Sequence, residues 1–158
     1  KEADGVWQQG IAYKALPHYV KDISNIDLNQ VAPMQEMPVQ SCIIEVNTET
    51  CKKSVTIQGF AWSGGGRGIQ RVDVSIDGGK NWNLATLGKG SEQPLHSAWA
   101  WTFWKITCPI DVTQKKLEIV CKATDASYNI QSNSEELIWN VRGLANNCWH
   151  RETTNLEE

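Results

Sequence analysis

Apolar and polar residues alternate along the chain from about residue 39 onward. In the stretch from 69 to 77, for example, Val72, Val74 and Ile76 are separated by single polar residues. Successive side chains of a β-strand point to opposite faces, so a period of two indicates strands with one buried face. Seven strands are expected in this way, at residues 39–46, 54–62, 69–77, 81–87, 98–107, 117–124 and 136–142. This arrangement predicts an all-β protein, an immunoglobulin-like β-sandwich of about seven strands.

The beginning of the chain follows a different pattern. The first 38 residues show no sustained period and are interrupted by Gly5, Gly10, Pro17, Pro33 and Pro38. Gly and Pro break regular structure, so this segment is expected to be an extended N-terminal lead-in that packs on something else. We therefore divide the chain into a lead-in and linker at 1–38, the sandwich at 39–151 and a C-terminal tail at 152–158.

One expected strand carries large aromatic residues on both faces. Trp99, Trp101 and Phe103 lie on one face, and Trp104 and Ile106 on the other. A strand that is bulky on both faces is expected to be covered on both, by the second sheet and by another domain or subunit. The eight tryptophans of the chain suit a β-core or a stable interface for the same reason.

Composition narrows the classes of partner. The length of 158 residues suits a single domain, and the start without Met leads us to expect a piece of a longer protein. With 15 Lys and Arg against 18 Asp and Glu, the net charge of -3 provides no overall positive field, so nucleic acid is not an expected partner. No apolar run approaches the roughly 20 residues that cross a bilayer, so no membrane partner is expected either.

The cysteines suit neither a disulfide scaffold nor a zinc ribbon. They are five in number, without a CxxC pair: Cys42, Cys51, Cys108, Cys121 and Cys148. An odd set with this spacing is expected to consist of buried free thiols.

Most catalytic templates are missing from the chain, including the P-loop, GxGxxG, GxSxG and HExxH. His18, His96 and His150 are far apart and lack ligand spacing with a Cys or a carboxylate. We therefore expect no catalytic residue and no metal ligand in this chain.

A glycine-rich stretch between two expected strands is the strongest candidate for a binding site. Gly64, Gly65 and Gly66 directly precede Arg67. Each Gly costs roughly 0.5–1 kcal/mol of conformational entropy relative to Ala, so the cluster calls for a geometric cause. A turn of this kind lets the backbone approach another molecule, and the planar guanidinium suits an oxyanion. The alternative is an ordinary flexible loop with a solvated Arg.

Several stretches carry a resemblance to a known family. They are residues 33–41, 59–82, 98–104, 120–129, 138–143 and 149–151, in the order that the family has them. The longest, from Gly59 to Trp82, includes the Ser-Gly-Gly-Gly-Arg turn. Together they resemble the molybdenum cofactor oxidoreductase dimerisation domain, which sulfite oxidases and assimilatory nitrate reductases share. The opening residues resemble the end of the family's preceding molybdenum domain.

The resemblance implies a homodimer that packs on its own molybdenum domain. It implies that Arg67, with the backbone of Gly64, Gly65 and Gly66, helps to bind the sulfite anion. It also implies a molybdenum–molybdopterin cofactor held by the N-terminal domain outside this chain, and a haem in a further domain is an additional expectation. No cofactor is expected to be bound by this chain alone, Cys42 and Cys121 are not expected to be ligands, and the fragment alone is expected to be inactive.

Two family functions and one non-catalytic role are open. Residues Arg142 and 149–151 look like a sulfite oxidase, whereas residues 146–148 are closer to a nitrate reductase. The end of the chain soon after Trp149, where nitrate reductases continue into further modules, favours a sulfite oxidase. By analogy its location would be the mitochondrial intermembrane space, or the cytoplasm for a nitrate reductase. A free-standing immunoglobulin-like scaffold without catalysis is the third hypothesis.

Overall fold

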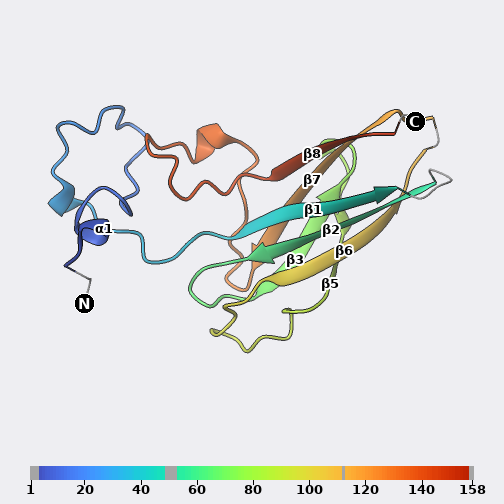
Figure 1. Cartoon of the computed structure of the whole chain (residues 1–158), viewed down its shortest axis with the longest axis horizontal. Helices are drawn as coiled ribbons and strands as arrows, with labels where there is room; N and C mark the ends of the chain where they lie inside the picture. Colours follow the sequence, from blue (N-terminus) through green and yellow to red (C-terminus); the bar gives the residue numbers. More distant parts are fainter. Residues whose placement is uncertain (1–3, 49–52, 112, 157–158) are drawn as a thin grey trace.

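Two four-stranded antiparallel sheets form the body of the protein. The computed structural model describes residues 4–48, 53–111 and 113–156. The first sheet has the order β1 (Gln40–Thr48), β2 (Ser54–Trp62), β6 (Thr102–Pro109) and β5 (Thr86–Leu87); the second has the order β4 (Asn83–Leu84), β3 (Ile69–Ser75), β7 (Lys116–Asp125) and β8 (His150–Asn155). Figure 1 shows the two sheets packed as layers. The expectation of an all-β sandwich is confirmed.

The remaining described segments contain little regular structure. They include three short helices, α1 (Val6–Gln9), η1 (Leu28–Gln30) and η2 (Glu135–Leu137). Residues 4–34 and 135–146 lie side by side at one end of the sandwich, and we call them the lobe (Figure 1). The Lys21 ammonium lies 3.7 Å from the ring centre of Trp139, which joins the two parts of the lobe. The expected division of the chain at residue 38 stays a prediction.

The core lies between the two sheets and follows the period of two. Val55 and Ile57 from β2 and Val72 and Val74 from β3 are fully buried. Trp104 of β6 is 2% exposed and packs against Gly59, where an added Cβ would lie 2.2 Å from the indole ring. Full burial of a valine or isoleucine side chain contributes about 1.5–3 kcal/mol. The alternating apolar residues that predicted these strands therefore also stabilise them.

The expected strand at 81–87 is two short strands in different sheets. Asn83 and Leu84 pair with β3, whereas Thr86 and Leu87 pair with β6. The buried Ala85 stands between the two pairings, where the chain crosses from one sheet to the other. A single alternating stretch therefore connects the two layers. Because it forms two strands rather than one, the structure has one strand more than we expected.

The expectation of a strand at 136–142 was wrong. The structure has η2 and a turn there, and Leu137 and Trp139 are 73% and 40% exposed. None of the described strands pairs with this segment, so its apolar alternation reflects residues on the surface of the lobe. The strand that does complete the second sheet is β8, which includes residues 152–155 that we had placed in the tail. It is an edge strand with mostly exposed polar residues, so it lacks the apolar alternation that marks the others.

Candidate functional site

The glycine-rich turn joins β2 to β3 and is tightly packed. Gly65 and Gly66 have φ of 67° and 68°, a backbone conformation that favours Gly. A Cβ on Gly64 would lie 2.5 Å from backbone atoms of Met37, and one on Gly66 would lie 2.4 Å from the carbonyl oxygen of His96. These glycines are needed because the linker and the loop before β6 pass close to the turn.

Arg67 extends from this turn to two carboxylates. Its Nε donates to Oδ2 of Asp125 at 2.9 Å, and its Nη1 donates to the Glu36 carboxylate. Nη2 lies 3.5 Å from the Met37 carbonyl oxygen. The Arg67 side chain is 19% exposed, whereas Asp125 is fully buried and Glu36 is 54% exposed. The guanidinium thus fastens the linker, through Glu36, to the end of β7, through Asp125.

The charges in this cluster stabilise one another. The hydrogen bond to Glu36 is the largest contribution that raises the pKa of Arg67, and the bond to Asp125 adds to it. Burial alone would raise the pKa of Asp125, but hydrogen bonds from Asn129 and Ser63 outweigh it and keep that pKa below its ordinary value. Both groups are therefore held in their charged forms, and the guanidinium is already neutralised by its neighbours.

The groove that Arg67 lines bears on its predicted role in binding the substrate. The arginine lines a groove of about 620 Å³ between the linker and residues 138–147. An anion that entered this groove would meet the Glu36 carboxylate, which lines the same groove and is already paired with the guanidinium. Binding of sulfite by Arg67 stays a prediction.

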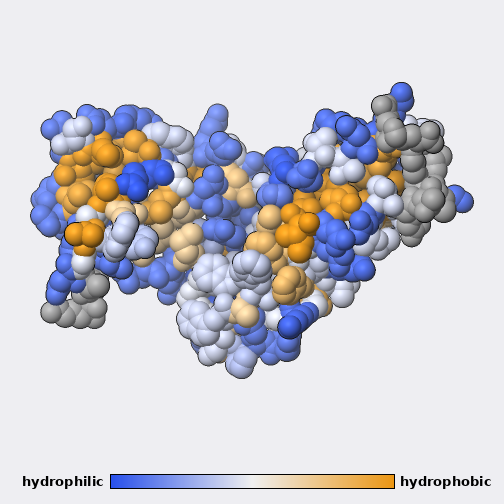
Figure 2. Space-filling model, in the orientation of Figure 1, coloured by the Kyte–Doolittle hydropathy of each residue, from blue (hydrophilic) through white to orange (hydrophobic). Residues whose placement is uncertain are grey.

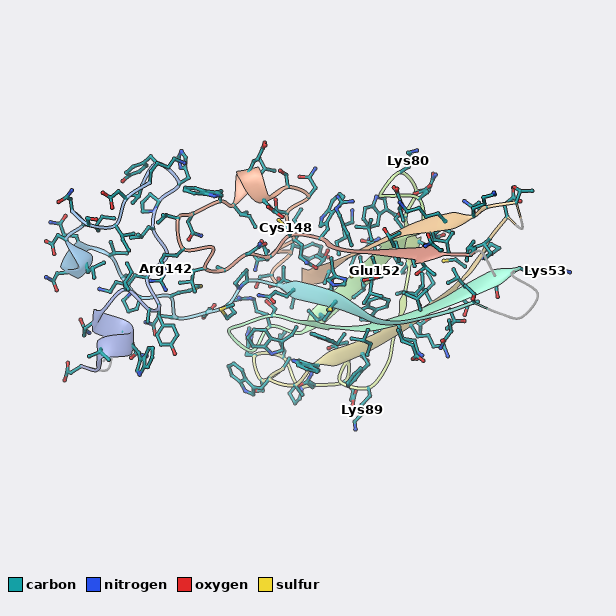
Figure 3. The ribbon with its side chains drawn as sticks, turned by 45° about the horizontal axis from the view of Figure 1, so that its top comes forward. Lys53, Lys80, Lys89, Arg142, Cys148 and Glu152 are labelled. Carbon is teal, nitrogen blue, oxygen red and sulfur yellow. The ribbon has the colours of Figure 1, made fainter. Side chains whose placement is uncertain are left out.

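A second arginine, Arg142, lies in the lobe and is differently placed. Its side chain is exposed, and no carboxylate of the described residues lies within ion-pair distance of it. It lines a groove of about 360 Å³ together with Trp139, Gly143 and Glu135, whose carboxylate does not reach ion-pair distance of the guanidinium. Figure 3 shows Arg142 on the lobe, far from Glu152 on the sandwich. The sequence marked this arginine only through the family resemblance and gave it no role, because the absence of a carboxylate partner depends on the tertiary structure.

Arg71 provides the contrast. It pairs with Asp73 two positions along the same strand face, with Nε 3.1 Å from Oδ2. The side chains at i and i+2 of a strand point the same way, so this ion pair is local. It has no contact with either groove.

The histidines and cysteines form no metal site in the part of the chain that is described, where no three His, Cys, Asp or Glu side chains gather. His150 accepts a hydrogen bond from the backbone N–H of Ile43 through Nδ1 at 3.3 Å. Burial raises the pKa of Cys121 to about 12, which opposes the thiolate form that a metal ligand needs. Cys42, Cys108, Cys121 and Cys148 are free thiols, and Cys51 lies outside the described residues. These residues do not fit a molybdenum centre.

Aromatic side chains gather on the outer face of the first sheet. Phe60 and Trp101 stack with ring centres 4.1 Å apart, and the Trp62 indole donates to the Trp99 carbonyl oxygen. Trp99, Trp101 and Phe103 are 63%, 53% and 40% exposed. Trp99 and Trp101 precede β6 rather than lying within it. We call Phe60, Trp62, Trp99, Trp101 and Phe103 the aromatic patch. Exposed aromatic side chains gathered on one face are typical of a contact surface.

Comparison with known proteins places the chain in a family. The model of the "Mo-co oxidoreductase dimerisation domain" matches residues 31–157. Mitochondrial sulfite oxidase from Homo sapiens is 46% identical over 96% of this chain, and sulfite oxidase from Gallus gallus is 43% identical over 95%. Nitrate reductase [NADH] from Cichorium intybus is 36% identical over 94%. This chain spans 28%, 32% and 15% of those proteins respectively.

A solved structure shares the fold. The sulfane dehydrogenase SoxCD from Paracoccus pantotrophus matches the whole chain and 40% of its own, with a TM-score of 0.64 and 24% identity. At that identity the likeness concerns the fold alone. None of the described helices has the length and apolarity needed to span a membrane. From the family match and the identities over nearly its whole length, this chain belongs to the Mo-co oxidoreductase dimerisation domain family.

Proposed function

We propose that this chain is the dimerisation domain of a sulfite oxidase, which in its full-length form oxidises sulfite to sulfate. The observation that carries the proposal is the difference in identity, 46% to a sulfite oxidase against 36% to a nitrate reductase over nearly the same residues. The molybdenum–molybdopterin cofactor belongs, in this proposal, to the remainder of the parent protein. That remainder would supply the redox chemistry, and this chain would supply an interface and a cation for the substrate.

Arg142 is the better placed of the two arginines to supply that cation. The family resemblance assigns the sulfite contact to Arg67, but its Nη1 is already paired with Glu36 and its Nε with Asp125. A charge without a carboxylate partner attracts an anion without first breaking an ion pair. Arg142 also belongs to the lobe, whose opening residues resemble the end of a molybdenum domain. We therefore propose that Arg142 meets the anion and that Arg67 holds the turn and the linker in place.

The lobe is the surface proposed to face the molybdenum domain. Large apolar side chains are exposed there: Val6 at 76%, Trp7 at 62%, Tyr19 at 72% and Leu137 at 73%. Figure 2 shows hydrophobic residues gathered over this end of the molecule. Exposed apolar surface of this extent is typical of a contact with another domain.

The aromatic patch is the surface proposed for the homodimer. Trp and Phe are enriched at stable interfaces, and three members of the patch are at least 40% exposed. Trp104, which we expected on the opposite face of this strand, belongs to the core at 2% exposure and takes no part. A specific dimer would bury on the order of 1,000 Å² or more in total.

Five similar sulfite oxidases have "mitochondrial" in their names, which supports a mitochondrial location for the parent protein, and we propose the intermembrane space within it. Neither nucleic acid nor a membrane is part of the proposal.

The test is an assay of the full-length parent protein with both substrates. We expect oxidation of sulfite with cytochrome c as the acceptor and no reduction of nitrate. Turnover of nitrate alone would assign the chain to a nitrate reductase. A parent gene that encodes no molybdenum domain would instead favour the free-standing scaffold.

A further inference from the structure

The turn that carries Arg142 is built by one side chain. Oδ1 of Asn140 accepts hydrogen bonds from the backbone N–H of Arg142 at 3.1 Å and of Leu144 at 3.2 Å. Nδ2 of the same amide donates to the Leu144 carbonyl oxygen at 2.8 Å. The Asn140 carbonyl oxygen accepts from the Gly143 N–H at 2.9 Å. In the described structure, the backbone between residues 141 and 144 thus makes its hydrogen bonds to Asn140.

The backbone of this turn needs such support. Gly143 has a φ of 62°, and Ala145 has a φ of 61°, which is unfavourable for a residue with a Cβ. A non-Gly residue in the left-handed region persists only where surrounding contacts hold it. No strand pairs with this segment, so a sheet cannot provide those contacts. The hydrogen bonds of the Asn140 amide take the place of those that a neighbouring strand would supply.

Both ends of the segment are fixed independently of Asn140. Before the turn, Trp139 lies against the Lys21 ammonium at 3.7 Å. After the turn, Nδ2 of Asn147 lies 3.3 Å from the Val39 carbonyl oxygen. Loss of the Asn140 amide would therefore loosen the turn between these two anchors without detaching the segment.

We infer that Asn140 is a positioning residue for the substrate arginine: it fixes the backbone from which Arg142 extends toward the anion. The inference rests on the proposed function, in which Arg142 contacts sulfite. The Arg142 side chain is exposed and has no ion pair of its own among the described residues, so the backbone of the turn sets the point from which its guanidinium can reach an anion. In this inference Asn140 acts through Arg142, since the oxygen and nitrogen of its side-chain amide are already bonded to the backbone of the turn.

The test is a double-mutant cycle in the full-length enzyme, with Asn140→Ala, Arg142→Gln and both together. We expect Asn140→Ala to raise the KM for sulfite about tenfold with a smaller change in kcat, because misplacement of a binding group weakens its contact. In the Arg142→Gln background the same change should have no further effect on KM. A purely structural role for Asn140 would give the same fold-change in both backgrounds and would overturn the inference.

Two further variants keep the test decisive. Asn140→Ser retains a short acceptor for a nearby N–H and should raise KM less than Ala does, and it replaces Asn140→Ala if that protein does not fold. Ser134→Ala is the matched control, since Ser134 accepts from the Glu136 N–H at the start of η2 in the same segment. It should leave KM unchanged. If Arg142→Gln itself binds sulfite normally, the assignment of Arg142 fails and the inference falls with it; if Arg142→Gln raises KM and Asn140→Ala does not, only the inference fails.

Discussion

Asp125 and Arg67 lie 58 residues apart in the sequence, yet Oδ2 of the fully buried carboxylate is 2.9 Å from Nε of the guanidinium. The same carboxylate oxygen accepts from the Ser63 hydroxyl at 2.7 Å, and the other accepts from the backbone N–H of Ser127 and Asn129. The pair therefore joins the turn between β2 and β3 to the chain that follows β7. Because of this connection, Arg67 stabilises the fold, whether or not it also contacts the substrate.

Replacing Arg67 with Gln should destabilise the protein. It would leave Asp125 buried without its cation, and removal of one partner from a buried pair typically costs about 3–5 kcal/mol. Because Arg67 is partly exposed, we expect a loss of about 2–3 kcal/mol in the free energy of unfolding, measured by denaturant titration. Arg67→Lys, which can keep a charge near Asp125, should lose less. An unchanged unfolding midpoint for the Gln protein would show that the pair does not hold the turn.

Arg142 and Arg67 should differ in how they affect sulfite binding. A charge-assisted contact is worth about 1.5–3 kcal/mol, so Arg142→Gln should raise the KM for sulfite roughly ten- to hundredfold with little change in the unfolding midpoint. Arg71→Gln is the control, because Arg71 pairs with Asp73 away from both grooves. The reverse result, a large rise in KM for Arg67→Gln and none for Arg142→Gln, would return the substrate contact to Arg67.

The homodimer should depend on the aromatic patch. Trp101→Ser removes the ring that stacks on Phe60, and we expect the dimer dissociation constant to rise by at least tenfold. Light scattering of the full-length protein over a dilution series measures this change. Trp82→Ser is the matched control, because Trp82 lies on the other sheet against Lys122 and Trp149. If Trp82→Ser separates the subunits and Trp101→Ser does not, the interface lies on the second sheet.

Asp125 should make the protein sensitive to acid. Its pKa in the folded state lies below the ordinary value of 3.8, because hydrogen bonds from Asn129 and Ser63 outweigh the effect of burial. A carboxyl group that is more acidic when folded stabilises the fold fully above its unfolded pKa, and this contribution is lost as the pH falls through the folded pKa. Unfolding midpoints measured below about pH 4 should fall more steeply for the wild type than for Asp125→Asn, whose stability is lower at neutral pH.

Cys121 should resist alkylation in the folded protein. Its thiol is fully buried, and a pKa of about 12 leaves on the order of one thiolate in ten thousand at pH 8. Treatment with iodoacetamide followed by peptide mass spectrometry should show Cys121 unmodified until denaturant is added. Cys148, which is only partly buried, provides the comparison within the same sample. Modification of Cys121 at the rate of Cys148 would show that the edge strand β8, which pairs with β7 at Cys121, opens readily.

The sequence by itself determined the layers of the sandwich. The alternation in β2 reflects side chains buried between two sheets, and burial of this kind is encoded locally because every second side chain of a strand points to the same face. The clustered glycines likewise marked a turn that backbone atoms approach closely. The family resemblance supplied the expectation of a dimerisation domain, which comparison with known proteins confirmed.

Only the tertiary structure decided which residues are partners. Residues 136–142 alternate like a strand but form none, since a strand needs a neighbour to take its hydrogen bonds, and β8 takes that place with a polar sequence. The partners of Arg67, Glu36 and Asp125, lie 31 and 58 residues away, so no local pattern could reveal that its charge is already neutralised. Arg142 lacks such a partner for the same reason, because ion pairs across a fold depend on how the chain returns rather than on the residues beside it.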